Sequence, residues 1–431
     1  MHRRVPLVFT PVLLATLLLP PRAPAQEISD SAQLAELERR VEALTRELER
    51  TQLGAEVVEP DSLLVGLGPA ASGVYRVGQG VSVGGYGEIV YENYARQRED
   101  NAASGRTDQI DALRAILYVG YKFNDRLLFN SEIEIEHGNE AFLEFAYLEY
   151  RFTADLGARA GMLLAPMGLV NELHEPLVWL GTTRPLIESA IIPTTWRESG
   201  VGLFGGTYAL SWRVYLMSSF DGVGGGSSGA SGFSAGGLRG GRQKGSRAAS
   251  EDFGLVGRLD YVGAPGLLVG ASAFRGETAH NRTVDGVEVG GATLIWDLHL
   301  DYKAAGLDLR ALVAGASVDD VADLNELRGL TGASSIGEEL LGWYVTAGYD
   351  VLRSTMSTHQ LLPYVRYERL NTQRAVPASF AASPANDLSA LSLGAAWKPI
   401  PQAVLKVDYN VHSNKASTGV DQLNVALGYL F

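Results

Sequence analysis

The chain has 431 residues, including 50 glycines, 18 tyrosines and no cysteine, which suits a loop-rich β protein and excludes a disulfide framework or a thiolate metal site. Its formal net charge is −13 at pH 7, and removing the three arginines of residues 1–25 makes it −16. This charge argues against a nucleic-acid partner, because such binding needs a basic surface.

The first 25 residues have the three parts of a secretory signal peptide. A basic start with Arg3 and Arg4 is followed by the apolar run 5–19 and by an Ala-Pro-Ala exit that ends at Ala25. We expect cleavage after Ala25. The alternative, an uncleaved membrane anchor, is disfavoured because the apolar run is short and small residues follow it.

Residues 26–53 are predicted to form a periplasmic coiled coil. Apolar residues recur there in alternating steps of three and four, at Leu34, Leu37, Val41, Leu44 and Leu48. The remaining faces are charged, which favours self-association over the alternative of one amphipathic helix lying on the next domain. Residues 54–79 are rich in glycine and contain two prolines, so they are predicted to be a linker.

Residues 80–431 predict an all-β fold, a transmembrane antiparallel β-barrel of about 16 strands. Sixteen runs alternate apolar residues with polar residues or glycine. The connections alternate as well, because short turns such as 124–126 and 263–266 separate long stretches such as 93–109, 165–199 and 221–252. Short periplasmic turns and long outer loops are typical of a membrane barrel, and a soluble β-sandwich does not need them.

The final run, 421–431, ends in Phe431. Leu423, Val425, Leu427 and Tyr429 share its parity, and this pattern resembles the signal that the barrel assembly machinery reads on outer-membrane proteins. A closed barrel is the only β structure that leaves no unpaired backbone groups in lipid. We therefore expect the bacterial outer membrane and its lipid as the surroundings, with the N-terminal helix in the periplasm.

Two connections depart from the alternation of short turns and long loops, since 137–140 is short for a loop and 353–359 is long for a turn. Counted with 93–109 and 137–140, residues 165–199 are the third connection on the long-loop side, and they are too apolar for an exposed loop. Four prolines prevent a long helix or a central strand, and Trp179 and Trp196 do not suit water. The run 222–241, rich in glycine and serine, is interpreted instead as a flexible outer loop.

Short motifs in and around the third connection, and in two strands, resemble the phosphate-selective porin O/P family of bacterial outer-membrane porins. Those of the connection are Gly161-Met162-Leu163-Leu164-Ala165-Pro166-Met167-Gly168, Arg184-Pro185 and Arg197-Glu198-Ser199-Gly200-Val201, and those of the strands are Gly257-Arg258-Leu259-Asp260-Tyr261 and Val365-Arg366-Tyr367-Glu368. The resemblance covers residues 80–431. It implies a homotrimer of sixteen-stranded barrels, each with its own pore narrowed by the third outer loop. Members of that family attract phosphate with many lumenal lysines, whereas this chain has only six lysines.

The candidate residues of a pore constriction are charged side chains on the third connection and on the inner parity of the strands. The connection contributes Glu172, His174, Glu175, Arg184, Glu188, Arg197 and Glu198, of which Arg184 and Arg197 are the leading candidates. The strands contribute Arg114, Arg159, Arg213, Arg258, Arg310, Arg366, Lys406, Glu132 and Glu134. Both signs on one wall create a transverse field that passes small polar solutes. The alternative is that these charges pair with one another and stiffen the wall.

The predicted function is an outer-membrane porin for passive diffusion of small hydrophilic solutes or ions, with anions such as phosphate among them. The alternatives are a structural or adhesive outer-membrane barrel and an outer-membrane hydrolase. No catalytic residue, cofactor or metal ligand is predicted. The Gly-x-Ser-x-Gly match that begins at Gly80 lies in a strand with no following helix, and His174-Glu175 lacks a second histidine at helical spacing.

Overall fold

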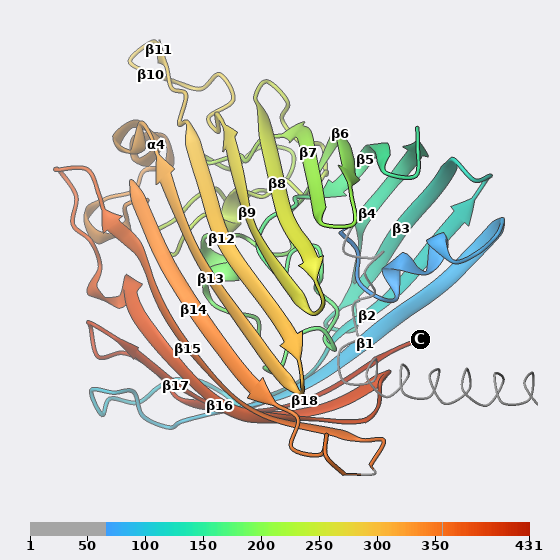
Figure 1. Ribbon diagram of the computed structural model, residues 1–431. Coiled ribbons are helices and arrows are strands. Elements are labelled where there is room, and N and C mark those ends of the chain that lie inside the picture. Colours follow the sequence, from blue (N-terminus) through green and yellow to red (C-terminus); the bar gives the residue numbers. More distant parts are fainter. Residues whose placement is uncertain (1–65, 356) are drawn as a thin grey trace, which may run out of the picture. The chain divides into compact units, whose positions relative to one another are not determined.

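The barrel fold is described by a computed structural model that covers residues 66–355 and 357–431. The predicted signal peptide, the predicted coiled coil and the first part of the predicted linker lie outside these residues. Within them the chain forms a closed antiparallel barrel of sixteen strands (Figure 1), which confirms the predicted fold class.

The barrel strands follow one another around the wall in chain order. They are β1 (Gly80–Tyr94), β2 (Gln109–Lys122), β3 (Leu127–Glu136), β4 (Glu140–Arg151), β5 (Leu156–Leu164), β6 (Arg197–Gly206), β7 (Leu210–Ser218), β8 (Phe253–Ala264), β9 (Leu267–Gly276), β12 (Thr293–Ala304), β13 (Leu307–Val318), β14 (Glu339–Tyr349), β15 (Gln360–Ala375), β16 (Asp387–Ile400), β17 (Ala403–Asn414) and β18 (Gln422–Leu430). The wall closes where β1 pairs with β18, for example at Gly87 and Tyr429. No backbone edge is therefore left open.

The other elements lie in connections. A two-stranded sheet, β10 (Thr283–Val284) and β11 (Val287–Glu288), stands between β9 and β12. In the described residues the helices are α3 (Ile187–Ala190) and α4 (Val321–Arg328), and the 3-10 turns are η1 (Ala71–Tyr75), which precedes β1, η2 (Arg239–Gly241), η3 (Gly332–Ser334) and η4 (Pro384–Asn386). No helix in the described part of the chain has the length and apolar character needed to cross a membrane.

Alternating residues give the wall an apolar outer face and a polar inner face. In β17 the buried residues include Val404, Lys406, Asp408 and Asn410, and the exposed residues are Leu405, Val407, Tyr409 and Val411. In β4, Glu144 and Glu149 are an odd number of residues apart, so strict alternation would place them on opposite faces. A β-bulge in the pairing of β3 with β4 changes this. The extra residue turns both Glu144 and Glu149 inward, where each is fully buried.

Long and short connections mostly alternate, so the barrel has a long-loop end and a short-turn end. The exceptions are the short connection between β3 and β4 and the longer one between β14 and β15. The third connection on the long-loop side is residues 165–196, because Arg197, Glu198 and Ser199 already belong to β6 and pair with β5. We call residues 165–196 the inward loop. Arg197 and Glu198 are consequently wall residues, and this corrects their predicted place on the loop.

The described half of the predicted linker packs inside the barrel at the short-turn end. Leu67, Ala71 and Val74 are at most 3% exposed, and η1 lies against β1, β2 and β3. The Nδ2 atom of Asn130 donates a hydrogen bond of 3.0 Å to the Ala71 carbonyl. We call residues 66–75 the N-terminal segment, and it fills part of the lumen because its apolar side chains avoid water.

Candidate functional site

The inward loop is closed at its neck by one amide side chain. Asn171 donates from Nδ2 to the carbonyls of Ala165 and Trp196, at 2.7 and 3.0 Å, and accepts the Trp196 N–H at 2.6 Å. The two loop ends also bond directly, from the Ala165 N–H to the Trp196 carbonyl at 3.0 Å. Apolar residues then bury the loop, with Met167, Ile191, Ile192 and Trp196 fully enclosed.

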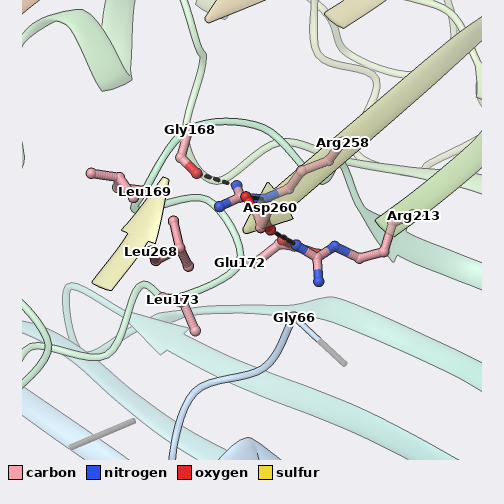
Figure 2. Close-up of a pocket in the computed structure, with 9 residues that line it drawn as sticks. All are labelled: Gly66, Gly168, Leu169, Glu172, Leu173, Arg213, Arg258, Asp260 and Leu268. Carbon is pink, nitrogen blue, oxygen red and sulfur yellow. Dashed lines mark hydrogen bonds and ion pairs between the residues drawn. The ribbon is translucent and has the colours of Figure 1, made fainter. Parts of the chain in front are cut away.

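The first half of the inward loop reaches three parts of the lumen. Glu172 forms an ion pair of 3.2 Å with Arg213 on β7. The Gly168 carbonyl accepts a bond from Arg258, next to Asp260 (Figure 2). His174 crosses to β3, where its Nε2 lies 3.0 Å from the Glu132 carboxylate. The loop therefore spans the lumen and does not lie along one wall.

Glu175 turns away from His174 and holds the N-terminal segment. Its carboxylate accepts the backbone N–H groups of Ala70 at 3.0 Å and Ala71 at 3.2 Å. Gly68 packs so closely that a Cβ there would lie 2.3 Å from Glu175 Oε1, which explains the glycine. His174 and Glu175 thus serve different contacts, and the described residues contain no group of three acidic or histidine ligands arranged for a metal.

The second half of the inward loop is bound to the opposite wall through its backbone. Asp408 on β17 accepts the Thr182 N–H at 2.7 Å, and Glu368 on β15 accepts the Leu186 N–H at 2.6 Å. Wall cations donate to loop carbonyls: Arg366 bonds Thr183, Arg310 bonds Val178, and Lys406 bonds Pro176 and Gly181. These candidate cations therefore position the loop.

Glu188 is also used inside the loop. Its carboxylate accepts the N–H groups of Leu169 at 2.8 Å and Val170 at 2.6 Å, and the Tyr344 hydroxyl at 2.5 Å. It is fully buried. Its charge consequently fixes the fold of the loop and does not line open space.

The candidate arginines of the wall all face inward, and each lies beside a carboxylate. The closest ion pairs are Arg114–Glu88 (3.4 Å), Arg159–Glu149 (2.9 Å), Arg197–Glu144 (2.6 Å), Arg213–Asp260 (2.8 Å), Arg258–Asp260 (2.8 Å), Arg310–Asp301 (3.0 Å) and Arg366–Glu368 (3.0 Å). Such pairing, which stiffens the wall, was the predicted alternative to a transverse field. It leaves these seven side chains largely neutralised by their neighbours.

Arg184 differs from the wall arginines because it forms no ion pair with any described residue. Its Nε and Nη2 atoms are buried and have no hydrogen-bond partner, and its guanidinium carbon lies 5.7 Å from the centre of the Trp179 ring. It interacts electrostatically with Arg114, Glu134 and Glu88 on the facing wall. Burial, and then the like charge of Arg114, lower the pKa of Arg184. The two leading candidates therefore differ, because Arg197 is paired with Glu144 and Arg184 has no ion-pair partner among the described residues.

Residues 219–252, which include the predicted flexible outer loop, instead pack inward against the inward loop. Phe220, Phe233 and Leu238 are fully buried, and Phe220 stacks on Trp196 with ring centres 4.3 Å apart. We call residues 219–252 the second loop. The prediction was wrong because two large apolar residues within the glycine-rich run provide enough burial to order it.

Glu198 holds the second loop by its backbone. Its carboxylate accepts the N–H groups of Gln243 at 2.7 Å, Lys244 at 3.2 Å and Gly245 at 3.3 Å. The second loop carries Arg239, Arg242 and Lys244, of which Arg239 lies within electrostatic range of Arg184, and none of the three was among the sequence candidates. The three cations follow the apolar Leu238 within six residues of the sequence, and this cluster was the signal that could have identified them.

Comparisons with known proteins agree with this architecture. The chain is 36% identical over 396 residues to an uncharacterized protein of Aquifex aeolicus (strain VF5), an alignment that covers 88% of this chain and 87% of that protein. The chain belongs to the same family as that protein. No family model matches the sequence.

The barrel is similar to solved outer-membrane proteins. The outer membrane channel DcaP of Acinetobacter baumannii matches at 12% identity with a TM-score of 0.52, over 81% of this chain and 97% of that chain. The anion-selective porin from Comamonas acidovorans matches at 10% identity with a TM-score of 0.51, over 81% and 99%. OmpT of Vibrio cholerae matches at 10% identity with a TM-score of 0.50, over 82% and 98%. The fold is that of outer-membrane porins.

Proposed function

We propose that this protein is an outer-membrane porin that lets small hydrophilic solutes diffuse passively, without a catalytic step or a cofactor. The observation that carries the proposal is the inward loop, which crosses the lumen and carries Arg184, a cation without an ion-pair partner among the described residues and within electrostatic range of Glu134 and Glu88. Fixed charges of both signs at a narrowing form a transverse field that orients polar solutes. The apolar outer face of the wall suits the surrounding lipid.

The route would run from the long-loop end to the short-turn end. A solute first meets Arg239 and Lys244, which are exposed on the second loop. It then passes Arg184, and finally the region where Tyr86, Glu132 and His174 are buried together. Because these three residues are almost fully enclosed, the route is narrow and we expect a small conductance.

Anion preference is part of the proposal, with phosphate as one candidate solute. Arg184 and the second-loop cations support it, and the shared motifs with the phosphate-selective porin O/P family point the same way. One observation argues against a phosphate filter like that family's, because the arginines of the wall are paired with carboxylates. Membership of that particular family is therefore proposed only on its short motifs.

The remaining sequence predictions belong to the same proposal. They are a signal peptide over 1–25, a periplasmic coiled coil over 26–53, a homotrimer, and insertion by the barrel assembly machinery through the strand that ends at Phe431. A trimer predicts a heat-sensitive band at three times the barrel mass on a gel. A monomer at every temperature contradicts this part of the proposal.

Single-channel recording in a planar bilayer tests the function. Discrete conductance steps in potassium chloride, with a reversal potential that favours chloride under a salt gradient, are expected. If folded protein gives no current, the porin hypothesis is wrong. A structural or adhesive barrel and an outer-membrane hydrolase are then the remaining hypotheses. Turnover of a lipid or peptide substrate by the silent protein distinguishes the last of these.

A further inference from the structure

The second loop places three cations close together without a carboxylate partner among the described residues. Arg242 uses Nη1 for the Thr195 carbonyl at 2.7 Å and Nε for the Arg239 carbonyl at 3.1 Å. Arg239 donates to the Thr194 carbonyl, and Lys244 is exposed. The hydrogen bonds of the two arginines go to backbone carbonyls, so no carboxylate in the described part of the chain neutralises these charges by direct contact.

Three carboxylates act on these cations, Glu136, Glu144 and Glu198, and the last two are already committed to other groups. Glu144 forms the ion pair with Arg197, and Glu198 accepts three backbone N–H groups of the second loop. Burial, and then the charges of Arg184 and Arg239 respectively, lower the pKa of Arg239 to about 10 and of Arg242 to about 9. Both remain charged at neutral pH, so like charges repel one another here.

The backbone that carries these cations is held rigidly. Gln243 is buried between them and donates from Nε2 to the carbonyls of Ser219 at 2.8 Å and Ala249 at 2.9 Å. Its Oε1 accepts the Ala249 N–H at 2.7 Å. A turn fixed on both sides, whose guanidinium and ammonium groups form no ion pair with a described carboxylate, is pre-organised for an anion.

We propose that Arg239, Arg242 and Lys244 of the second loop, together with Arg184 of the inward loop, form a binding subsite for multivalent oxyanions. Unpaired, buried donor atoms on Arg184 give the subsite its deep end. A solute with two or three carboxylate or phosphate charges relieves the repulsion that a single chloride relieves only in part. This inference rests on the proposed function, because it places the subsite on the route of a permeating solute.

The test is block of the potassium chloride current by added sodium citrate or sodium phosphate. We expect half-block at millimolar concentration or below for the wild type. The triple variant Arg239→Gln, Arg242→Gln and Lys244→Gln is expected to raise the half-blocking concentration by at least about tenfold. Because two of these side chains also hold the inward loop, Lys244→Gln alone serves as a second variant with an intact fold and a weaker block.

Arg247→Gln is the matched control, since Arg247 is an exposed arginine of the same loop. Block by citrate alone assigns the subsite to polycarboxylates, and block by both anions assigns it to oxyanions in general. An ohmic chloride current that neither anion blocks, or equal block of the wild type and the triple variant, overturns the subsite while the porin stands. If no current is seen, the proposed function fails, and calorimetric titration of folded protein in detergent with citrate decides the subsite by itself.

Discussion

Asn171 and Trp196 are joined by a pair of hydrogen bonds between one side-chain amide and one backbone unit. Asn171 Oδ1 accepts the Trp196 N–H at 2.6 Å, and Nδ2 donates to the Trp196 carbonyl at 3.0 Å. Because the two residues are separated by 24 others and both are fully buried, this pair closes the inward loop without solvent competition.

Replacing Asn171 with alanine should loosen the inward loop. The Trp196 N–H would lose its acceptor, and an unsatisfied buried group costs about 1–3 kcal/mol. We expect a lower unfolding temperature and increased current noise in single-channel records. Asn139→Ala, in an exposed turn, is the control and should leave both unchanged. Equal noise in wild type and variant contradicts a loop held by Asn171.

Replacing Arg184 with alanine should shift the reversal potential toward cations. The variant removes the unpaired charge of the inward loop and leaves Glu134 and Glu88 facing the route. Measurement under a potassium chloride gradient checks the change. Arg126→Ala, an exposed arginine in a short turn, should have no effect. An unchanged reversal potential for the Arg184 variant shows that this arginine is structural.

Arg197→Ala should reduce stability more than it changes selectivity. It leaves the buried Glu144 carboxylate without its ion-pair partner at 2.6 Å, and breaking a buried pair costs about 3–5 kcal/mol. The double variant with Glu144→Gln should recover much of the loss in urea unfolding. Arg374→Ala breaks the exposed pair with Glu339 and should cost at most about 1 kcal/mol. No recovery in the double variant contradicts the pairing.

The hold of Glu175 on the N-terminal segment should weaken as pH rises. Burial raises the pKa of Glu175 from its ordinary value of 4.5 to about 8. The docked state therefore retains a proton that the undocked state releases, so docking becomes less favourable between about pH 4.5 and pH 8. We expect channel conductance to increase over this range as the segment loosens.

Glu175→Gln keeps the size of the side chain and removes its titration. This variant should lose the pH dependence of conductance while its barrel remains folded. Val74→Asp supplies the complementary test, because a charge in place of a buried valine should release the segment at every pH. If conductance of the wild type is constant from pH 5 to pH 9, the segment does not control the route.

The barrel could be predicted from sequence because membrane strands obey two simple rules. Alternation placed Arg114, Arg310 and Lys406 on the inner parity, and the structure buries all three inside the wall. Connection lengths then gave the inward loop its position as the third connection on the long-loop side. Both rules depend only on residues that are close in sequence, so a single sequence was sufficient to predict the barrel.

Charge partners could not be predicted in the same way. Arg184 and Arg197 look equivalent as residues of one apolar connection, yet only Arg197 meets a carboxylate, and it does so because a β-bulge turns Glu144 inward. The prediction for the second loop failed for a related reason. Its glycines indicate flexibility locally, whereas its order depends on Phe233 and Leu238 packing against distant residues.

The contact of Glu175 with Ala70 and Ala71 couples the N-terminal segment mechanically to the inward loop. A displacement of residues 66–75 would act on Glu175 through two backbone hydrogen bonds, and the adjacent His174 contacts Glu132 on the wall. A pull from the short-turn end is thereby delivered to the inward loop and not only to the first strand.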